Sequence, residues 1–162
     1  MNAKILLLAR AVTYATLFVS FVLIFVPARV LTATGIGRPA AIGVWQVAGV
    51  LVGLAGAALA LWCILTFVFV GRGTPAPFDP TRRLVVRGPY RLARNPMYIG
   101  AGLAVFGAAL FYQSIALLGY VGVFFLMAHV LVIGYEEPTL RRMFGQEYNE
   151  YCQNVGRWWP GE

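Results

Sequence analysis

Charged residues are scarce in this sequence, and acidic residues are the scarcest of them. Only 12% of the 162 residues are charged, whereas a soluble domain carries roughly 25%. Six residues are acidic, and none of them precedes Asp79. Because 60% of the residues are hydrophobic and the mean hydropathy is +0.74, the composition indicates a membrane protein. The length allows one domain and is too short for separate cofactor and substrate domains.

The residues that build metal sites and disulfide frameworks are also few. A single histidine, His129, excludes a multi-histidine metal site. Cys63 and Cys152 lack both the spacing of a zinc site and the number needed for a disulfide framework, so we interpret them as two unrelated thiols. The sequence contains no P-loop and no nucleophile elbow. Gly100 and Gly102 form a lone Gly-x-Gly within an apolar run, which is not a soluble dinucleotide motif.

Arginine supplies most of the charge that is present. The formal net charge is +7, and every basic residue except Lys4 is an arginine. A basic balance can indicate a nucleic-acid partner, but arginines that flank apolar runs more often report membrane topology. We therefore expect no nucleic-acid partner.

Apolar runs predict about four membrane helices, because a spanning helix needs about 20 apolar residues. Residues 5–26, 42–70 and 115–135 reach that length, and Pro27 is expected to end the first helix. The run over residues 97–111 is short, and we expect Asn95 and Pro96 to form its first turn, where proline is tolerated. The N-terminal run resembles a signal peptide, but it is long enough to span and contains Arg10, so we interpret it as a retained helix.

The connections between these runs predict a topology. Only residues 112–114 separate the last two runs, which predicts a tight antiparallel hairpin of two helices. Arginines concentrate in residues 71–96 and in the C-terminal tail, whereas the hairpin tip is uncharged. The positive-inside rule then places the long loop, the tail and both termini in the cytoplasm. Arg29 and Arg38, in the short loop between the first two helices, weaken this bias without reversing it.

Two patterns within the helices suggest specific contacts. Gly49, Gly53 and Gly56 permit close helix approach, which serves packing within the bundle or, alternatively, contact between two copies. His129 is expected to be a hydrogen-bond partner between helices, and an acid or base role is the alternative.

The adjacent Glu136 and Glu137 are expected at the cytoplasmic end of the last membrane helix. Carboxylates there face the negative end of the helix dipole, so their presence favours a functional role. The alternative is a solvated pair balanced by Arg141 and Arg142.

The tail that follows the acidic pair carries aromatic residues at helical spacing. Phe144, Tyr148 and Tyr151 predict an amphipathic helix that packs over the cytoplasmic mouth of the bundle. Trp158 and Trp159 suit the headgroup interface.

Together these features predict an all-α fold, a polytopic membrane helix bundle with a C-terminal helical hairpin and an amphipathic tail helix. Its polar cluster at the cytoplasmic end, which contains Tyr90, Asn95, Tyr98 and the glutamate pair, suits a reaction between a water-soluble donor and a lipid-borne acceptor.

Two motifs extend this interpretation. The segment RRLVVRGPYRLARNPMYIG, followed about 35 residues later by EEPTLRRMFGQEYNEY, resembles the integral-membrane methyltransferases. This superfamily includes isoprenylcysteine carboxyl methyltransferases and phosphatidylethanolamine N-methyltransferases. The similarity covers residues 72–155, and the earlier helices match only in being apolar. It implies a single membrane domain over residues 1–162, with N-terminal transmembrane helices over 1–70 and a cofactor-binding catalytic core over 71–162.

The resemblance implies S-adenosylmethionine as the cofactor. Methyl transfer from it requires no metal, and the predicted topology makes the cofactor site face the cytoplasm. The residues carried over as cofactor contacts are Arg82, Arg83, Leu84, Val85, Tyr90, Asn95, Pro96, Met97, Tyr98, Gly100 and Glu136. No catalytic side chain is assigned, although His129 is the nearest intramembrane base.

The same resemblance bears on the acceptor, which we expect to be a lipid or prenyl-lipid from the bilayer. Carboxyl methyltransferases usually have histidine where Asn95 stands, and an arginine that contacts substrate where Val132 stands. These differences favour N-methylation of an aminophospholipid. Carboxyl O-methylation of an isoprenylcysteine-like substrate is the alternative, and a non-catalytic scaffold or small transporter is a further one.

Overall fold

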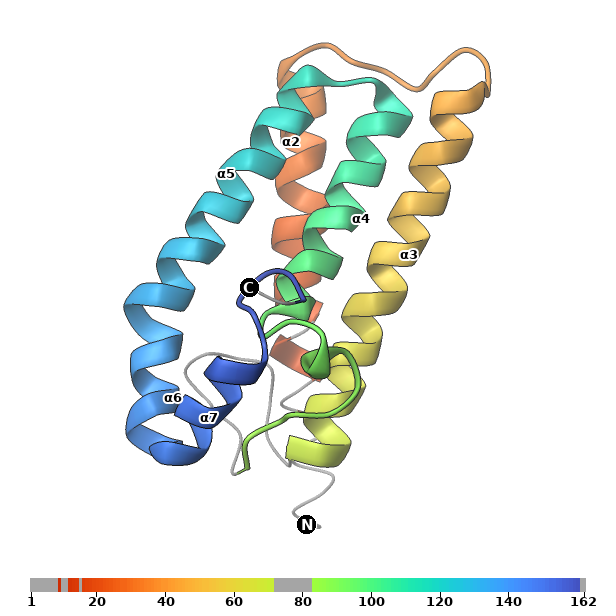
Figure 1. Cartoon of the computed structure of the whole chain (residues 1–162). Coiled ribbons are helices and arrows are strands. Elements are labelled where there is room, and N and C mark those ends of the chain that lie inside the picture. The colour runs from red at the N-terminus through yellow and green to blue at the C-terminus, as the bar shows by residue number, and fades with distance from the viewer. Residues whose placement is uncertain (1–8, 10–11, 15, 72–82, 161–162) are drawn as a thin grey trace.

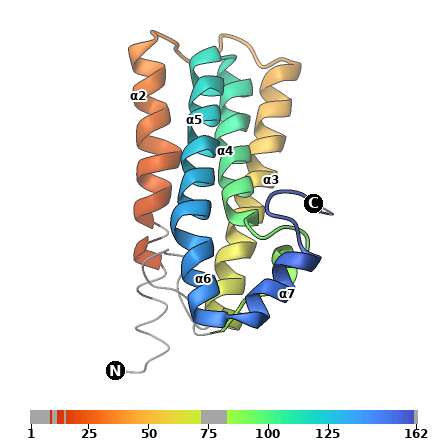
Figure 2. The ribbon, with the colours of Figure 1, turned by 60° about the vertical axis from the view of Figure 1, so that its left-hand side comes forward.

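Helices arranged side by side form the body of the molecule (Figures 1 and 2). The computed structural model describes residue 9 and residues 12–14, 16–71 and 83–160. The π-helical segment η1 (Val19–Phe25) leads into α2 (Val26–Ala33), and α3 (Val44–Thr66) continues as the π-helical η2 (Phe67–Gly71). They are followed by α4 (Pro96–Tyr112) and α5 (Ile115–Leu131). The described residues contain no strand.

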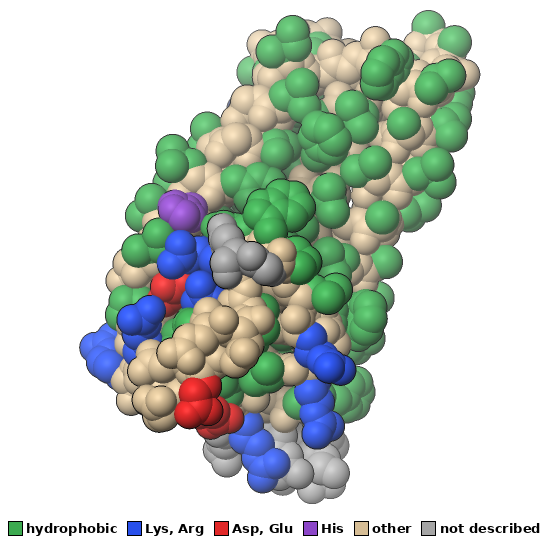
Figure 3. Space-filling model, viewed as in Figure 1, with side chains coloured by type: hydrophobic (Ala, Val, Ile, Leu, Met, Phe, Trp, Pro, Cys, Tyr) green, Lys and Arg blue, Asp and Glu red, His purple; other side chains and the backbone are tan. Residues whose placement is uncertain are grey.

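Three of the continuous helices are long and apolar enough to cross a membrane: Val12–Ala33, Val44–Gly71 and Ile115–Phe144. Pro96–Tyr112 is a shorter apolar helix. Between 6% and 22% of their most apolar windows is buried within the protein, so most of these side chains face outward, as lipid contact requires. Hydrophobic side chains cover the upper part of the molecule, and charged ones gather at its lower end (Figure 3). The predicted all-α membrane bundle is confirmed.

The prediction that Pro27 ends the first helix is wrong, because the helix continues to Ala33. Pro27 lies in the first turn of α2, directly after the π-helical segment. A π-helical turn changes the hydrogen-bonding register, and a proline is tolerated in a first turn because the N–H group that it lacks has little use there. The chain therefore passes through Pro27 without breaking.

Small residues bring α3 and α4 into close contact. A Cβ atom at Gly56 would lie 2.6 Å from the Gly100 carbonyl oxygen, and one at Gly49 would lie 2.6 Å from the Gly107 carbonyl oxygen. Any side chain at these positions would separate the two helices. The expected role of Gly49 and Gly56 in packing within the bundle is confirmed.

The predicted hairpin is also confirmed. Helix α4 starts at Pro96 with Asn95 as its N-cap residue and ends at Tyr112, after which Gln113 adopts a left-handed conformation with φ 50°. The Ser114 side chain then accepts a hydrogen bond of 3.2 Å from the Leu117 amide and caps α5. The α2–α3 connection lies at the same end of the bundle as this turn (Figures 1 and 2).

The expected end of the last membrane helix, at Tyr135, is wrong. The helix continues through a π-helical turn, η4 (Val132–Glu136), into α6 (Glu137–Phe144). The glutamate pair therefore lies inside a continuous helix and not at a C-terminus, so the unfavourable dipole that we expected does not apply to it.

The tail forms two short helices and not the single amphipathic helix that its spacing predicts. Gly145, with φ 53°, separates α6 from α7 (Gln146–Asn154). The aromatic residues still pack inward, because Tyr148 and Tyr151 of α7 cluster with Phe144 of α6 and Leu84 of the loop. Helix α7 lies at the lower end of the bundle (Figure 2).

Candidate functional site

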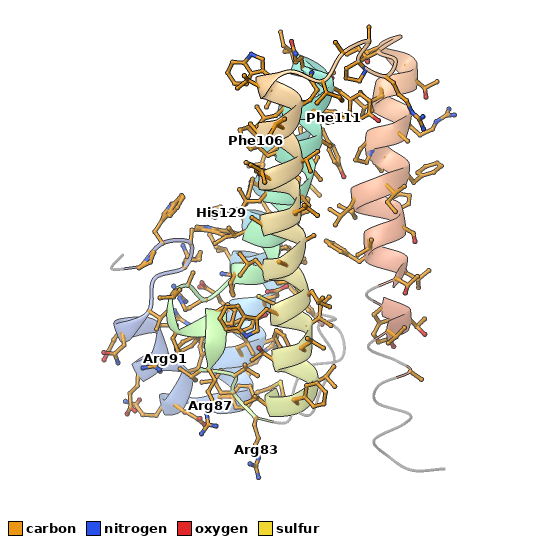
Figure 4. All side chains as sticks on the ribbon, turned by 90° about the vertical axis from the view of Figure 1, so that its right-hand side faces the viewer. Arg83, Arg87, Arg91, Phe106, Phe111 and His129 are labelled. Atoms are coloured by element: carbon orange, nitrogen blue, oxygen red, sulfur yellow. The ribbon has the colours of Figure 1, made fainter. Side chains whose placement is uncertain are left out.

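The candidate site lies at the lower end of the bundle, where four segments meet. They are the loop over residues 83–95, the first turn of α4, the η4–α6 junction and the tail that follows α7. In Figure 4, Arg83, Arg87 and Arg91 of the loop lie at this end, and His129 of α5 lies above them.

The loop is held in place by a buried aromatic anchor, Tyr90, in the short 3₁₀ helix η3 (Gly88–Arg91). Its ring packs edge-on against Phe67 at 5.1 Å between centroids and also contacts Cys63 and Val85. The Tyr151 hydroxyl donates a 2.6 Å hydrogen bond to the Tyr90 carbonyl oxygen. Burial, reinforced by the adjacent Cys63 thiol, raises the pKa of Tyr90 well above its usual range. Tyr90 is therefore a neutral packing residue in this structure, and its contact with a cofactor stays a prediction.

Glu137 is the most strongly paired carboxylate of the site. Arg94 Nη1 donates to its Oε1 atom at 3.0 Å. Arg157 donates from Nε to Oε1 at 2.7 Å and from Nη2 to Oε2 at 3.2 Å. Only 9% of the Glu137 side chain is exposed, so both oxygens are bound by guanidinium groups within the protein. The alternative, a solvated pair balanced by Arg141 and Arg142, is wrong for Glu137, which is buried and pairs with arginines far away in sequence.

Glu136 has a different environment. The Tyr98 hydroxyl donates a short hydrogen bond to its Oε1 atom. Its other oxygen accepts no hydrogen bond from any residue in the part of the chain that the structure describes. Two of the sequence-predicted cofactor residues, one in α4 and one in η4, are thus brought into direct contact, and one carboxylate oxygen remains available.

Asn95 is the N-cap residue of α4. Asparagine is a common N-cap residue that accepts a hydrogen bond from the helix, but the Asn95 side chain makes no capping bond. Its Nδ2 atom instead donates to the Arg157 carbonyl oxygen at 3.2 Å. The tail therefore holds Asn95 in place.

The other predicted contact residues lie in several different environments. Met97 packs on the cluster of Cys63, Val85 and Tyr90, and Leu84 packs on the tail cluster around Tyr148. Gly100 lies in the α3–α4 contact, where a Cβ atom would be 2.7 Å from the Ala60 nitrogen. Pro96 is buried and Arg83 is exposed, and Arg82 lies outside the described residues.

His129 accepts a hydrogen bond from the tail. The Trp158 indole nitrogen lies 3.1 Å from His129 Nδ1. Because an indole N–H can only donate, Nδ1 must be the acceptor, and a neutral His129 carries its proton on Nε2. This contact supports the role of a hydrogen-bond partner, although the partner comes from the tail and not from a neighbouring membrane helix.

Sequence reasoning missed Arg94 and Arg157 as site residues. Arg94 immediately precedes Asn95, and its Nη1 atom also donates to Cys152 Sγ at 2.9 Å. Its Nε atom is buried and has no hydrogen-bond partner in the described structure. A buried glutamate needs a cationic partner, which could have indicated that an arginine belongs to the site. The sequence does not say which arginine it is.

Comparisons with known proteins bear on the family of the chain. A model of the phospholipid methyltransferase family matches residues 44–147, starting at the first residue of α3 and covering more than half of the chain. The nickel-cobalt-cadmium resistance protein NccN of Alcaligenes xylosoxydans xylosoxydans is 29% identical over 121 residues, which cover 72% of this chain. The chain spans about half of that relative, 52% of its length.

No solved structure matches the chain. Within the described residues, no group of three or more histidine, cysteine or acidic side chains could hold a metal ion. The resemblance noted in the sequence is confirmed by the family match, which covers both motifs up to Glu147: the chain belongs to the phospholipid methyltransferase family.

Proposed function

We propose that the chain is an S-adenosylmethionine-dependent methyltransferase that acts on a lipid or prenyl-lipid within the bilayer, and that the methylated group is an amine. The observation that carries this proposal is the Tyr98–Glu136 pair. It leaves one carboxylate oxygen available where the charged end of the molecule meets its apolar bundle, in a chain that belongs to a methyltransferase family.

The residues present suit the chemical groups of this cofactor. The free oxygen of Glu136 can accept from an ammonium or hydroxyl group. Arg94 Nε is a buried donor without a partner in the described structure, and buried donors are normally satisfied, so this atom suits an anionic group such as a carboxylate. Asn95 and Tyr98 would complete the contacts. When bound, the cofactor supplies a methyl group already activated by a sulfonium.

The protein's own contribution is then alignment and exclusion of water. In-line displacement at an activated carbon needs positioning and a dry site more than it needs a nucleophilic side chain. Buried Tyr90 and Pro89 fix the loop, while Tyr98 orients Glu136. In the direction set by the arginine distribution, this site faces the cytoplasm, and residues 71–162 form the catalytic core together with α3.

The surroundings of Val132 bear on the chemical nature of the acceptor. This residue is 1% exposed and packs against Tyr98, Ala101 and Phe124. The carboxyl methyltransferases that the sequence resembles have an arginine at this position. The two arginines of the site, Arg94 and Arg157, are already paired with Glu137. A buried acceptor carboxylate without a partner would cost several kcal/mol, which favours a neutral amine.

His129 is a weak candidate for the base that removes the amine proton. Its Nδ1 lone pair is occupied by the Trp158 indole N–H. To accept a proton, the imidazole would first have to release Trp158. The simplest alternative is that the amine loses its proton to water before it reaches the site.

The test is the methylation rate against pH, measured with an aminophospholipid and, separately, with a prenylcysteine analogue. An amine attacks in its neutral form, so its rate should rise with pH toward the amine's pKa. A carboxylate is already ionised at pH 6, so its profile should be flat above that. Turnover of the prenylcysteine alone, with a flat profile, would favour the carboxyl alternative. Absence of turnover with both would favour the non-catalytic alternative.

A further inference from the structure

A short segment of the tail, Gly156–Trp158, crosses the site as a strap. The Arg94 backbone N–H donates to the Gly156 carbonyl oxygen at 2.9 Å. The Arg157 carbonyl oxygen accepts from Asn95, and the Arg157 guanidinium binds Glu137. Trp158 donates to His129. These three consecutive residues thus contact the loop, the η4–α6 junction and α5.

Within this tail strap, Arg157 has a distinct electrostatic position. Oε1 of Glu137 is shared between Arg94 and Arg157, but Oε2 is bound by Arg157 alone. Loss of Arg157 would therefore leave Glu137 with an unpaired oxygen one residue away from the free oxygen of Glu136. Among the described residues, Arg157 is one of two arginines that pair with Glu137, so its loss makes the surroundings of the two glutamates more negative by one charge. Arg141 adds a weaker positive influence on Glu137 from the same helix.

We propose that Arg157 is a positioning residue. It engages both oxygens of Glu137 and leaves Glu136 as the one carboxylate of this cluster, among the described residues, that can meet a cationic ligand. This inference rests on the proposed function, since the cationic ligand is S-adenosylmethionine.

The physical reason is competition between neighbouring carboxylates. Two available carboxylates would offer a cation two positions, of which only one aligns it for transfer. Neutralising one of them removes the competing position. Because Arg157 is anchored by the strap through its own carbonyl oxygen as well as its guanidinium, its geometry is fixed by the same contacts that fix Asn95.

The test compares two ligands that differ by one charge. S-adenosylmethionine carries a sulfonium, whereas S-adenosylhomocysteine carries a neutral sulfur. Both ligands carry the same ammonium and carboxylate groups, so the ratio of their affinities for purified protein reports the electrostatic environment at the sulfonium and cancels losses that the two ligands share. Arg157→Gln makes the cluster more negative and should shift the ratio roughly three- to tenfold toward S-adenosylmethionine. Glu137→Gln should shift it by a similar factor in the opposite direction.

Two further variants serve as controls. Arg157→Lys keeps the charge and should leave the ratio within about twofold of the wild-type value. The double variant Glu137→Gln, Arg157→Gln restores the charge balance and should return the ratio to the same range. In Arg157→Gln, the turnover rate at saturating cofactor should fall even though the ratio favours the cofactor, because the cation can then lie against Glu137.

A purely structural role for Arg157 would weaken both ligands equally and leave the ratio unchanged in a folded Arg157→Gln protein, which would overturn the inference. If Arg157→Gln does not fold, Glu137→Gln and the double variant decide. A ratio that stays shifted in the double variant would then contradict charge compensation. Failure of the proposed function would look different, because the wild-type protein itself would bind neither ligand.

Discussion

Glu136→Gln and Glu137→Gln remove the same charge from adjacent positions, yet the contacts of the two side chains predict different outcomes. Glu136 accepts one hydrogen bond, from Tyr98, and a glutamine oxygen can still accept it. Glu137 binds two arginines through three hydrogen bonds. We expect Glu136→Gln to lower cofactor affinity with little effect on folding. We expect Glu137→Gln to lower stability more than cofactor affinity.

The magnitudes follow from these contacts. Losing a charge-assisted contact to a ligand costs about 1.5–3 kcal/mol, which is on the order of tenfold to a hundredfold in affinity. Breaking a buried ion pair by removing one partner costs about 3–5 kcal/mol. Because the Arg157 side chain is 28% exposed, water can partly solvate it after the change, so we expect the cost of Glu137→Gln to lie near the lower end of that range.

Two measurements on detergent-purified protein separate the effects: calorimetric titration with S-adenosylmethionine and the thermal midpoint. Glu147→Gln is a matched control, because it removes a carboxylate from an exposed position on α7. Glu136→Gln should show the large loss of affinity at a nearly unchanged midpoint, and Glu137→Gln should show a midpoint lower by several degrees and a smaller loss of affinity. Equal losses of affinity, or a larger loss for Glu137→Gln, would mean that Glu136 is not the carboxylate that binds the cofactor.

Packing, topology and alkaline stability provide further tests. Gly56→Leu should destabilise the protein by about 1–3 kcal/mol or more, because a Cβ atom there would lie 2.5 Å from the Ala104 nitrogen. Gly119→Leu is the control, since a Cβ atom at Gly119 meets open space. The thermal midpoint should fall for the first variant and not for the second. In intact cells, an impermeant thiol reagent should label a cysteine placed at Gln113 and not one at Leu92, and the reverse would invert the orientation. Burial raises the pKa of Tyr148 above about 10, the value in an unfolded chain, so the contribution of Tyr148 to stability should be constant below pH 10 and fall above it. Tyr148→Phe should reduce that fall in the midpoint.

The apolar runs predicted where helices lie better than where they end. Hydropathy reports which residues can contact lipid, and the runs near residues 42–70 and 115–135 correspond to helices in the structure. Helix ends depend on whether backbone hydrogen bonding can continue. At Pro27 and at Glu136 it continues next to π-helical segments, which no pattern of apolar residues indicates. Both expected stops were therefore wrong.

Some residues of the candidate site could be identified from the sequence, and others could not. The motif residues Asn95, Tyr98 and Glu136 were identified from sequence, and the structure brings them to one end of the bundle. The partners of Glu137 were not identified from sequence, because Arg94 and Arg157 lie 43 and 20 residues away from it. Sequence spacing pointed to the nearby Arg141 and Arg142, as helical neighbours usually interact. The tail fold determines which arginine is used, and that fold depends on the Gly145 break.

The central claim is that this protein transfers a methyl group from S-adenosylmethionine to a molecule in the membrane. The most direct measurement is incubation of the purified protein with methyl-labelled cofactor and a total lipid extract, followed by identification of the labelled product by mass spectrometry. We predict label in the lipid fraction with wild-type protein and with Glu147→Gln, and at least tenfold less with Glu136→Gln at limiting cofactor. Folded wild-type protein that leaves the lipid fraction unlabelled, or that labels it equally after Glu136→Gln, would contradict the claim.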